Sequence, residues 1–222
     1  MYKIIVLGLA LSLFGLPPAT AQQRSGTPDL ATVTDAKAWK VSDATAETME
    51  VDGRRAIRLT VAGDWVGLAL PLGWTFETGT VEVDLKGKNL KQRSFLGVAF
   101  NVVDEKTFEA IYFRPFNFKA EEPFGKRSVQ YIALPENTWE KLRTNTPGQF
   151  ENSVNPVPDP DGWFHARIEV TDSQVRVFVN GATEASLTVG RLARGGDNRG
   201  VGLFVSTVEG IYANLKVTPA MR

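Results

Sequence analysis

The chain has 222 residues, with 25 lysine or arginine residues, 25 aspartate or glutamate residues, one histidine and no cysteine. Its formal net charge is zero and it has no basic run, which argues against nucleic acid and anionic membrane as partners, since both require a cationic face. The lack of cysteine excludes a disulfide framework and a lipid-modified N-terminal cysteine.

Residues 1–21 have the pattern of a secretory signal peptide. Lys3 precedes the apolar run Ile4–Leu16, and Ala19-Thr20-Ala21 forms an A-x-A cleavage site. The apolar run is shorter than the roughly 20 residues that span a bilayer, which disfavours the alternative of a retained membrane helix. We expect export to the periplasm or beyond without membrane attachment, then a polar leader over residues 22–37 and one domain over residues 38–218.

Most of the chain after the leader alternates apolar and polar residues, the pattern of half-buried strands. In 79–87, for example, Val81, Val83 and Leu85 share one face, and Glu82 and Asp84 lie on the other. Similar runs, each closed by turn residues, cover 54–61, 64–70, 94–103, 107–118, 163–170, 174–181, 185–189, 200–206 and 210–217.

No window has a convincing helical stripe, and 135–144 reads as a short, turn-rich piece between strands. The Asn180-Gly181 pair is a strong hairpin signal. The segment 145–163 contains four prolines and two glycines, which predicts a long irregular loop of a kind that is more often functional than not. The pattern predicts an all-β, antiparallel two-sheet jelly-roll sandwich.

The order of these segments resembles the concanavalin A-like lectin/glucanase superfamily, and more narrowly laminin-G-like and 3-keto-disaccharide hydrolase-like secreted bacterial domains. The resemblance covers roughly residues 39–217 and rests on "FEAIYFRP", "VQY" and "GIYANLKV". It implies a jelly roll whose concave sheet often handles carbohydrate. It implies no activity, because this fold carries lectins, hydrolases and adhesion modules alike.

The aromatic stretch 107–118 is the strongest candidate for a binding surface. If Ile111 and Phe113 fill the core, Tyr112 and Arg114 stand on the open face of their sheet. Rings and planar polar groups of this kind recognise the C–H face and the hydroxyls of sugars. With contributions from the neighbouring segments, the predicted ligand-binding residues are Asn101, Tyr112, Arg114, Gln130 and Trp139. The alternative is that these side chains pack over the sheet, with Arg114 held by a carboxylate at the sandwich edge.

Three carboxylates are candidate catalytic residues. Glu82 and Asp84 match the start of the Glu-x-Asp-x-(x)-Glu pattern of the glucanase branch that the chain resembles, although Lys86 stands where a second glutamate belongs. The alternative is an ordinary solvent-facing strand. Glu109 lies on the opposite face from Arg114 by simple alternation, so a shared site needs a bulge. A buried Glu109 otherwise needs a cationic or hydrogen-bonding partner.

Nucleophilic and metal chemistry have less support. His165 is the single histidine, it shares a face with polar neighbours, and no G-x-S-x-G elbow is present. No cofactor is expected, apart from a possible structural Ca²⁺. The loops 158–162 and 195–200 have the oxygen-bearing residues that calcium prefers, with Asp197 and Asn198 as candidate ligands. Tight turns use the same residues.

The functional hypothesis is an exported carbohydrate-binding sandwich, with an oligosaccharide or polysaccharide as partner. The alternatives are a glycoside hydrolase or 3-keto-glycoside hydrolase-like enzyme on the same fold, and a non-catalytic cell-envelope interaction module that uses the 145–163 loop.

Overall fold

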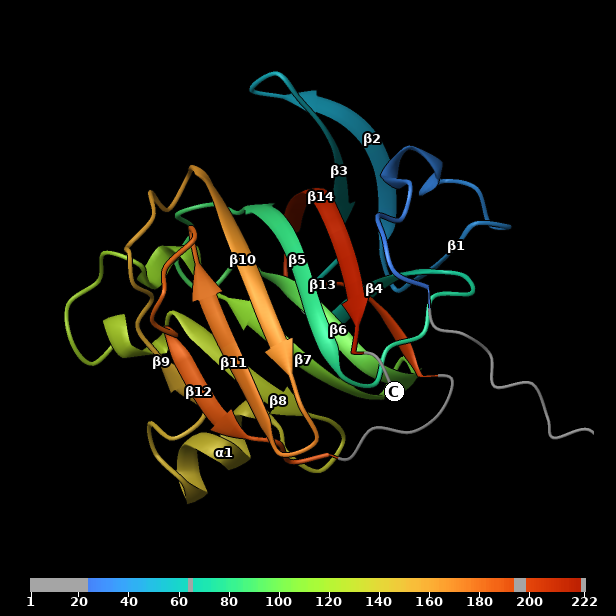
Figure 1. Cartoon of the computed structure of the whole chain (residues 1–222). Helices are drawn as coiled ribbons and strands as arrows, with labels where there is room; N and C mark the ends of the chain where they lie inside the picture. The colour runs from blue at the N-terminus through green and yellow to red at the C-terminus, as the bar shows by residue number, and fades with distance from the viewer. Residues whose placement is uncertain (1–23, 64–65, 194–198, 221–222) are drawn as a thin grey trace, which may run out of the picture.

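Two seven-stranded antiparallel sheets pack face to face and form the protein (Figure 1). The computed structural model describes residues 24–63, 66–193 and 199–220, so the expected signal peptide lies outside the described residues. The predicted all-β, antiparallel two-sheet sandwich is confirmed.

The strand order of each sheet mixes distant parts of the chain, as in a jelly roll. Sheet 1 runs in the order β1 (Trp39–Ser42), β4 (Val66–Pro71), β13 (Gly200–Ser206), β6 (Phe95–Asp104), β7 (Thr107–Phe113), β8 (Val129–Ala133) and β9 (Glu151–Asn152). Sheet 2 runs in the order β12 (Leu187–Gly190), β11 (Gln174–Val179), β10 (Trp163–Val170), β5 (Gly79–Lys86), β14 (Glu209–Pro219), β3 (Arg54–Thr60) and β2 (Thr45–Val51).

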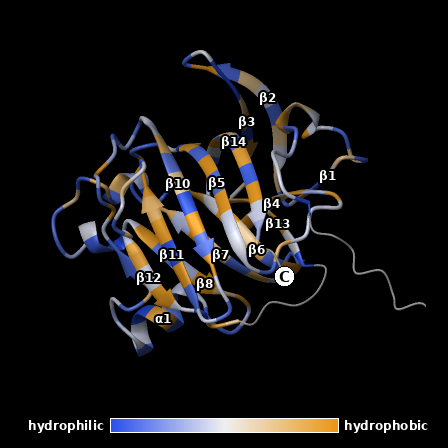
Figure 2. Ribbon diagram, viewed as in Figure 1, coloured by the Kyte–Doolittle hydropathy of each residue, from blue (hydrophilic) through white to orange (hydrophobic). Residues whose placement is uncertain are grey.

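Period-two alternation decides which side chains enter the core between the sheets. In β10, Phe164, Ala166, Ile168 and Val170 are buried, and the residues between them are half-buried on the outer face. Figure 2 shows the same alternation of hydrophobic and hydrophilic residues along the strands of sheet 2, which faces the viewer. Along β10, sheet 2 therefore offers one face to the core and one to the surroundings, whereas β7 and β8 of sheet 1 are buried on both faces.

Two turns have the left-handed backbone that tight hairpins require. Asp52 and Gly53 both have positive φ, 51° and 72°, and join β2 to β3 with two residues. Asn180 and Gly181 also have positive φ, 49° and 74°, and begin the connection between the antiparallel strands β11 and β12. The predicted hairpin signal at Asn180-Gly181 therefore marks a real chain reversal.

The segments outside the strands contain short helices. The piece expected to be turn-rich contains the helix α1 (Trp139–Asn145), whose first turn is capped by the Thr138 hydroxyl, which accepts a hydrogen bond from the amide of Lys141 at 3.3 Å. The described residues also contain three single-turn 3₁₀ helices: η1 (Leu30–Thr32), η2 (Pro115–Asn117) and η3 (Gly125–Arg127). No helix among the described residues is long and apolar enough to cross a membrane.

Two segments expected to lie outside regular structure pack against the sandwich. In the leader, Gly26 forms an antiparallel bridge with Val217, and Val33 is buried. In the loop 145–163, the short strand β9 pairs with β8, and the neighbouring Phe150 and Val154 are buried. The loop is therefore part of the edge of sheet 1.

Candidate functional site: a hollow on the outer face of sheet 1

The outer face of sheet 1 carries a hollow of about 580 Å³. Its floor comes from neighbouring strands of the sheet, with Phe95 from β6, Tyr112 from β7, Ile132 from β8 and Phe204 from β13. Its walls come from α1, from the loop between β7 and β8 that contains η2 and η3, and from the loop between β5 and β6. The hollow thus lies over the segment 107–118 that the sequence singled out.

Three polar side chains form a buried network in the floor. Tyr112 and Gln130 are direct cross-strand partners, so their side chains share the outer face. The Tyr112 hydroxyl donates to Gln130 Oε1 at 3.1 Å. Arg114 donates from Nη2 to the Tyr112 hydroxyl at 2.8 Å and also to Gln130 Oε1. Its Nη1 donates to the backbone carbonyl of Arg127 at 2.9 Å.

This network holds the Tyr112 side chain in the floor of the hollow, and neither face of its ring is open to solvent. Tyr112 is 4% exposed, its ring stacks on Phe204 with centroids 5.3 Å apart, and the Arg114 guanidinium lies 4.9 Å from its centroid. Burial raises the pKa of the Tyr112 hydroxyl, which the charge of Arg114 offsets in part. Burial also lowers the pKa of Arg114. Tyr112 therefore holds polar groups in the floor, and its own ring has no free face for stacking.

Two exposed rings stand at the rim. Trp139, at the start of α1, is 42% exposed and has the Arg143 guanidinium 4.9 Å from its ring centroid. Phe124, in the loop before η3, is 45% exposed and has the Arg127 guanidinium at 5.4 Å. The sequence reasoning named Trp139 and missed Phe124. A single phenylalanine in the polar, turn-rich stretch "AEEPFGKRS" was the available signal.

Glu151 is the carboxylate that holds the arginines of the hollow. It lies directly across from Gln130 in the short strand β9 and is 6% exposed. Both of its oxygens accept hydrogen bonds from Arg143, at 2.9 and 2.6 Å. Arg114 and Arg127 approach it at 3.7 and 3.9 Å. The hydrogen bonds to Glu151 raise the pKa of Arg143. A carboxylate near Arg114 at the sandwich edge belongs to the alternative in which these side chains pack over the sheet, and the sequence did not reveal its position.

Gly97 allows β6 and β7 to pack closely beneath the hollow. It is the cross-strand partner of Tyr112 in β6. A Cβ atom at this position would lie 2.0 Å from the carbonyl oxygen of Ile111 and 2.7 Å from Tyr112 Cα. The strands can therefore hold this geometry only with glycine at position 97.

Glu109 lies on the other face of β7, inside the sandwich. It is fully buried and forms an ion pair with Arg191, with Nη2 2.8 Å from Oε1. Tyr131 donates its hydroxyl to Oε2 at 2.5 Å, and Asn101 donates its amide to Oε1 at 2.9 Å. Burial and the charge of Glu109 raise the pKa of Tyr131. Glu109 and Arg114 therefore occupy opposite faces, as alternation in an unbulged β7 requires.

Asn101 and Gln130 are the predicted ligand-binding residues that do not line the hollow: Gln130 is buried and hydrogen-bonded to Tyr112 and Arg114, and Asn101 lies in the interior. The register of β6 against β7 shifts between Phe100 and Asp104, and Asn101 adopts a positive φ of 51°. This bulge ends the simple alternation on which the expectation depended, and the Asn101 amide reaches Glu109. Asn101 belongs to the interior cluster.

Glu82 and Asp84 lie on the outer face of sheet 2, across the sandwich from the hollow. Asp84 Oδ1 is 2.8 Å from His165 Nδ1, and Asp84 Oδ2 accepts from Arg54 at 2.8 Å and from Asn214 at 2.7 Å. Burial acts to raise the pKa of Asp84, but the hydrogen bonds from His165 and Asn214 outweigh it and lower the pKa. Glu82 pairs with Lys216 at 2.9 Å. These carboxylates are tied into a cross-strand network of ion pairs.

The described residues contain no group of three or more histidine, cysteine or acidic side chains arranged to hold a metal ion. Asp197 and Asn198, the candidate calcium ligands, lie outside the described residues. In the other candidate loop, Asp159 Oδ1 accepts from the amide of Asp161, and Asp161 Oδ1 accepts from the amide of Asn89. These two carboxylates bind backbone amides in and beside their turn.

No protein-family model and no curated protein matches the chain. Solved structures match its fold. A carbohydrate-binding module CBM66 from Bacillus subtilis aligns with TM-score 0.55 and 12% identity over 80% of this chain and 93% of that chain. A Bacillus subtilis protein of unknown function with a galectin-like fold aligns with TM-score 0.56 and 13% identity over 90% and 99%. A Bacillus licheniformis β-glucanase aligns with TM-score 0.54 and 12% identity over 90% and 100%. These likenesses show a concanavalin A-like jelly-roll fold.

Proposed function

We propose that this concanavalin A-like sandwich is an exported protein that holds a glycan in the hollow on sheet 1. The observation that carries the proposal is the combination of two exposed rings at the rim, Trp139 and Phe124, with a buried polar floor of Tyr112, Gln130 and Arg114. Sugars bind by stacking their C–H faces on rings and by hydrogen-bonding their hydroxyls. A carbohydrate-binding module among the structural neighbours supports the same reading.

The roles differ from residue to residue. Trp139 and Phe124 stack against the sugar from two walls. Arg114 hydrogen-bonds to it from the floor, and Tyr112 and Gln130 hold Arg114 in place. A volume of about 580 Å³ lies within the usual range of small-ligand sites and suits a short saccharide segment.

A glycan array followed by calorimetric titration tests the proposal. We expect a binder whose affinity falls about tenfold or more in Trp139→Ala, because stacking on a rim ring contributes to binding. The matched control is Trp74→Ala, which changes a half-buried tryptophan that does not line the hollow. The absence of any saccharide binder across a wide panel contradicts the proposal.

Glycoside hydrolysis is the second candidate, and a β-glucanase among the structural neighbours favours it. Hydrolysis needs two carboxylates that flank the scissile bond, roughly 5–9 Å apart. Among the described residues, Glu140 is the acidic side chain that lines the hollow, and Arg143 engages both oxygens of Glu151. The binding proposal therefore ranks first. Reducing-sugar release that disappears in Glu140→Gln but persists in Glu82→Gln establishes hydrolysis in the hollow.

A cell-envelope interaction module is the third reading, with the 145–163 segment as its contact. Part of that segment forms the edge of sheet 1 and supplies Glu151 to the hollow. Removing only its exposed residues 156 and 157 separates the two roles. Retained glycan binding in that variant speaks for the hollow and against the loop.

A further inference from the structure

Positive side chains outnumber negative ones around the hollow. Among the described residues that line it, one is acidic, Glu140, and four are basic: Lys91, Arg114, Arg127 and Arg143. Glu151, behind Arg143, adds a second carboxylate. Four cations against two carboxylates leave an excess of two positive charges, although the whole chain has a formal net charge of zero.

Glu151 forms hydrogen bonds with one of its three arginines. Arg143 takes both oxygens in a bidentate pair, the strongest form of this contact. Arg114 and Arg127 lie at 3.7 and 3.9 Å, beyond hydrogen-bond distance. The remaining excess charge is therefore concentrated toward Arg114, Arg127 and Lys91.

Arg127 has donors available to a ligand. Its side chain is 31% exposed, and among the described residues its guanidinium donates no hydrogen bond. It lies over the exposed ring of Phe124, as does the Lys91 ammonium at 5.6 Å. One wall of the hollow thus presents a ring with two cations over it. A sugar stacked against this wall would have its equatorial substituents beside positive charge.

We propose that the ligand of the hollow is an acidic saccharide, in which a sugar ring carries a carboxylate or a sulfate group. The inference rests on the proposed function and names its ligand class. Guanidinium groups bind carboxylate and sulfate through parallel N–H donors, and an incoming anion relieves the repulsion among clustered cations. A neutral saccharide leaves that repulsion in place.

Calorimetric titration with three oligosaccharides of equal length tests this inference: a carboxylated oligogalacturonate, a sulfated heparin fragment and a neutral cello-oligosaccharide. We expect one of the two acidic probes to bind at least tenfold more tightly than the neutral one and to weaken as salt is raised. Which acidic probe binds more tightly identifies the anion. In Arg127→Gln the acidic affinity falls about 10- to 100-fold, the effect of one lost charged hydrogen bond.

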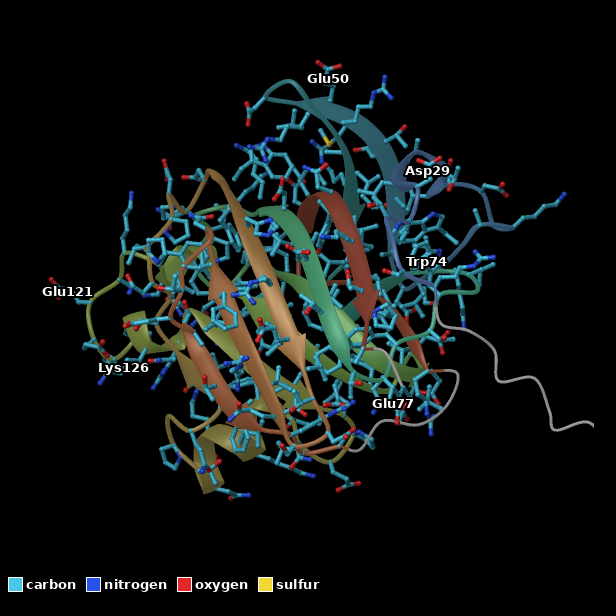
Figure 3. The ribbon with its side chains drawn as sticks, in the orientation of Figure 1. Asp29, Glu50, Trp74, Glu77, Glu121 and Lys126 are labelled. Carbon is cyan, nitrogen blue, oxygen red and sulfur yellow. The ribbon has the colours of Figure 1, made fainter. Side chains whose placement is uncertain are left out.

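Lys126→Gln is the matched control, because it removes the same charge from the neighbouring position. Lys126 is exposed and does not line the hollow, and Figure 3 shows it with Glu121 at the outer edge of the molecule. Equal affinity for the neutral and acidic probes, or equal losses in Arg127→Gln and Lys126→Gln, overturns the inference while the proposed function stands. Failure of all three probes and of the wider glycan panel overturns both.

Discussion

The two faces of β7 use the same chemistry for different ends. On the inner face, Glu109 pairs with Arg191. On the outer face, Glu151 of the edge strand β9 pairs with Arg143 and lies near Arg114. The inner pair is 0% and 1% exposed in its side chains. Arg191 also donates to the carbonyls of Glu77 and Thr171 at 3.1 Å. One carboxylate pairs with one guanidinium there, and Tyr131 and Asn101 donate further hydrogen bonds to Glu109.

The outer cluster is unbalanced and open. One carboxylate serves three guanidiniums, and the Arg127 and Arg143 side chains are 31% and 25% exposed. A buried ion pair is tolerated when its partners and hydrogen bonds are complete, which describes the inner cluster. Surplus charge beside water-accessible rings is what a recognition surface offers. The inner cluster is therefore a complete buried ion pair, and the outer cluster has the surplus positive charge that our proposed ligand would meet.

Removing the inner cation produces the largest effect. In Arg191→Met the fully buried Glu109 loses its charge partner, and breaking a buried pair costs about 3–5 kcal/mol. Urea unfolding followed by circular dichroism measures the loss. The matched control is Arg176→Met, whose ion pair with Glu169 lies on the outer face of sheet 2 with Arg176 48% exposed, so its cost stays within about 1 kcal/mol. Similar losses in both variants contradict a structural role for the inner pair.

Adding a methyl group beneath the hollow produces the next effect. In Gly97→Ala the new Cβ meets the backbone of β7 at 2.0 Å, and overpacking of this kind costs about 1–3 kcal/mol. Gly190→Ala is the control, because a Cβ there meets nothing within 4 Å. Thermal unfolding compares the two variants. An unchanged midpoint for Gly97→Ala means that the strands separate easily, and then Tyr112 is not held as rigidly as we infer.

Removing the outer carboxylate, Glu151, lowers stability by less than the two changes above, and we expect it to increase the affinity for an acidic saccharide. In Glu151→Gln the arginines lose their carboxylate, but water reaches Arg127 and Arg143, so we expect a loss of about 1–2 kcal/mol, near the low end for charged hydrogen bonds. Affinity for an acidic saccharide rises, because the surplus positive charge grows. Denaturant unfolding and calorimetry provide the two readouts. Glu140→Gln changes an exposed carboxylate at the rim and leaves stability unchanged. A loss of stability in Glu151→Gln as large as that in Arg191→Met contradicts the proposed difference between the inner and outer clusters.

Much of this comparison could be predicted from period-two alternation alone. It placed Glu109 and Arg114 on opposite faces of β7, and Glu82 with Asp84 on an outer face, all as observed. Alternation is local and needs only that a strand be regular. It was wrong about Asn101, because a bulge in β6 interrupts the regular strand at that residue.

The partners of these residues could not be predicted. Arg191 lies 82 positions from Glu109, and only the packing of the loop after β12 brings them together. Glu151 and Phe124 lie in segments without periodicity, so nothing local assigns them a face. Their positions depend on the pairing of β9 with β8 and on the path of the loop before η3. Of the residues that line the hollow, Tyr112, Arg114 and Trp139 could be predicted from the sequence, and the others depend on long-range packing.

The outer face of sheet 2 carries a cluster formed by His165, Asp84 and Glu82. We expect the smallest effect on stability there. The hydrogen bond between His165 and Asp84 raises the pKa of His165 above its usual value of about 6.5, with the charges of Asp84 and Glu82 adding to the shift and partial burial opposing it. The groups that face the ring are these two carboxylates of β5, which in turn bind Arg54 and Lys216.

The sign of the pH dependence follows from that raised pKa. Protonated His165 is favoured in the folded protein, so its contribution to stability is complete below about pH 6.5 and is lost as the pH rises through the higher folded-state pKa. His165→Gln should therefore be less stable than the parent protein at pH 5.5, and the difference should shrink toward pH 8.5. Because the side chain is 36% exposed, the change stays below that of Glu151→Gln. Unfolding curves at the two pH values measure it. A difference that grows with pH means that the ring acts in its neutral form, donating Nδ1–H to Asp84, and the protonated ring is then not the stabilising form.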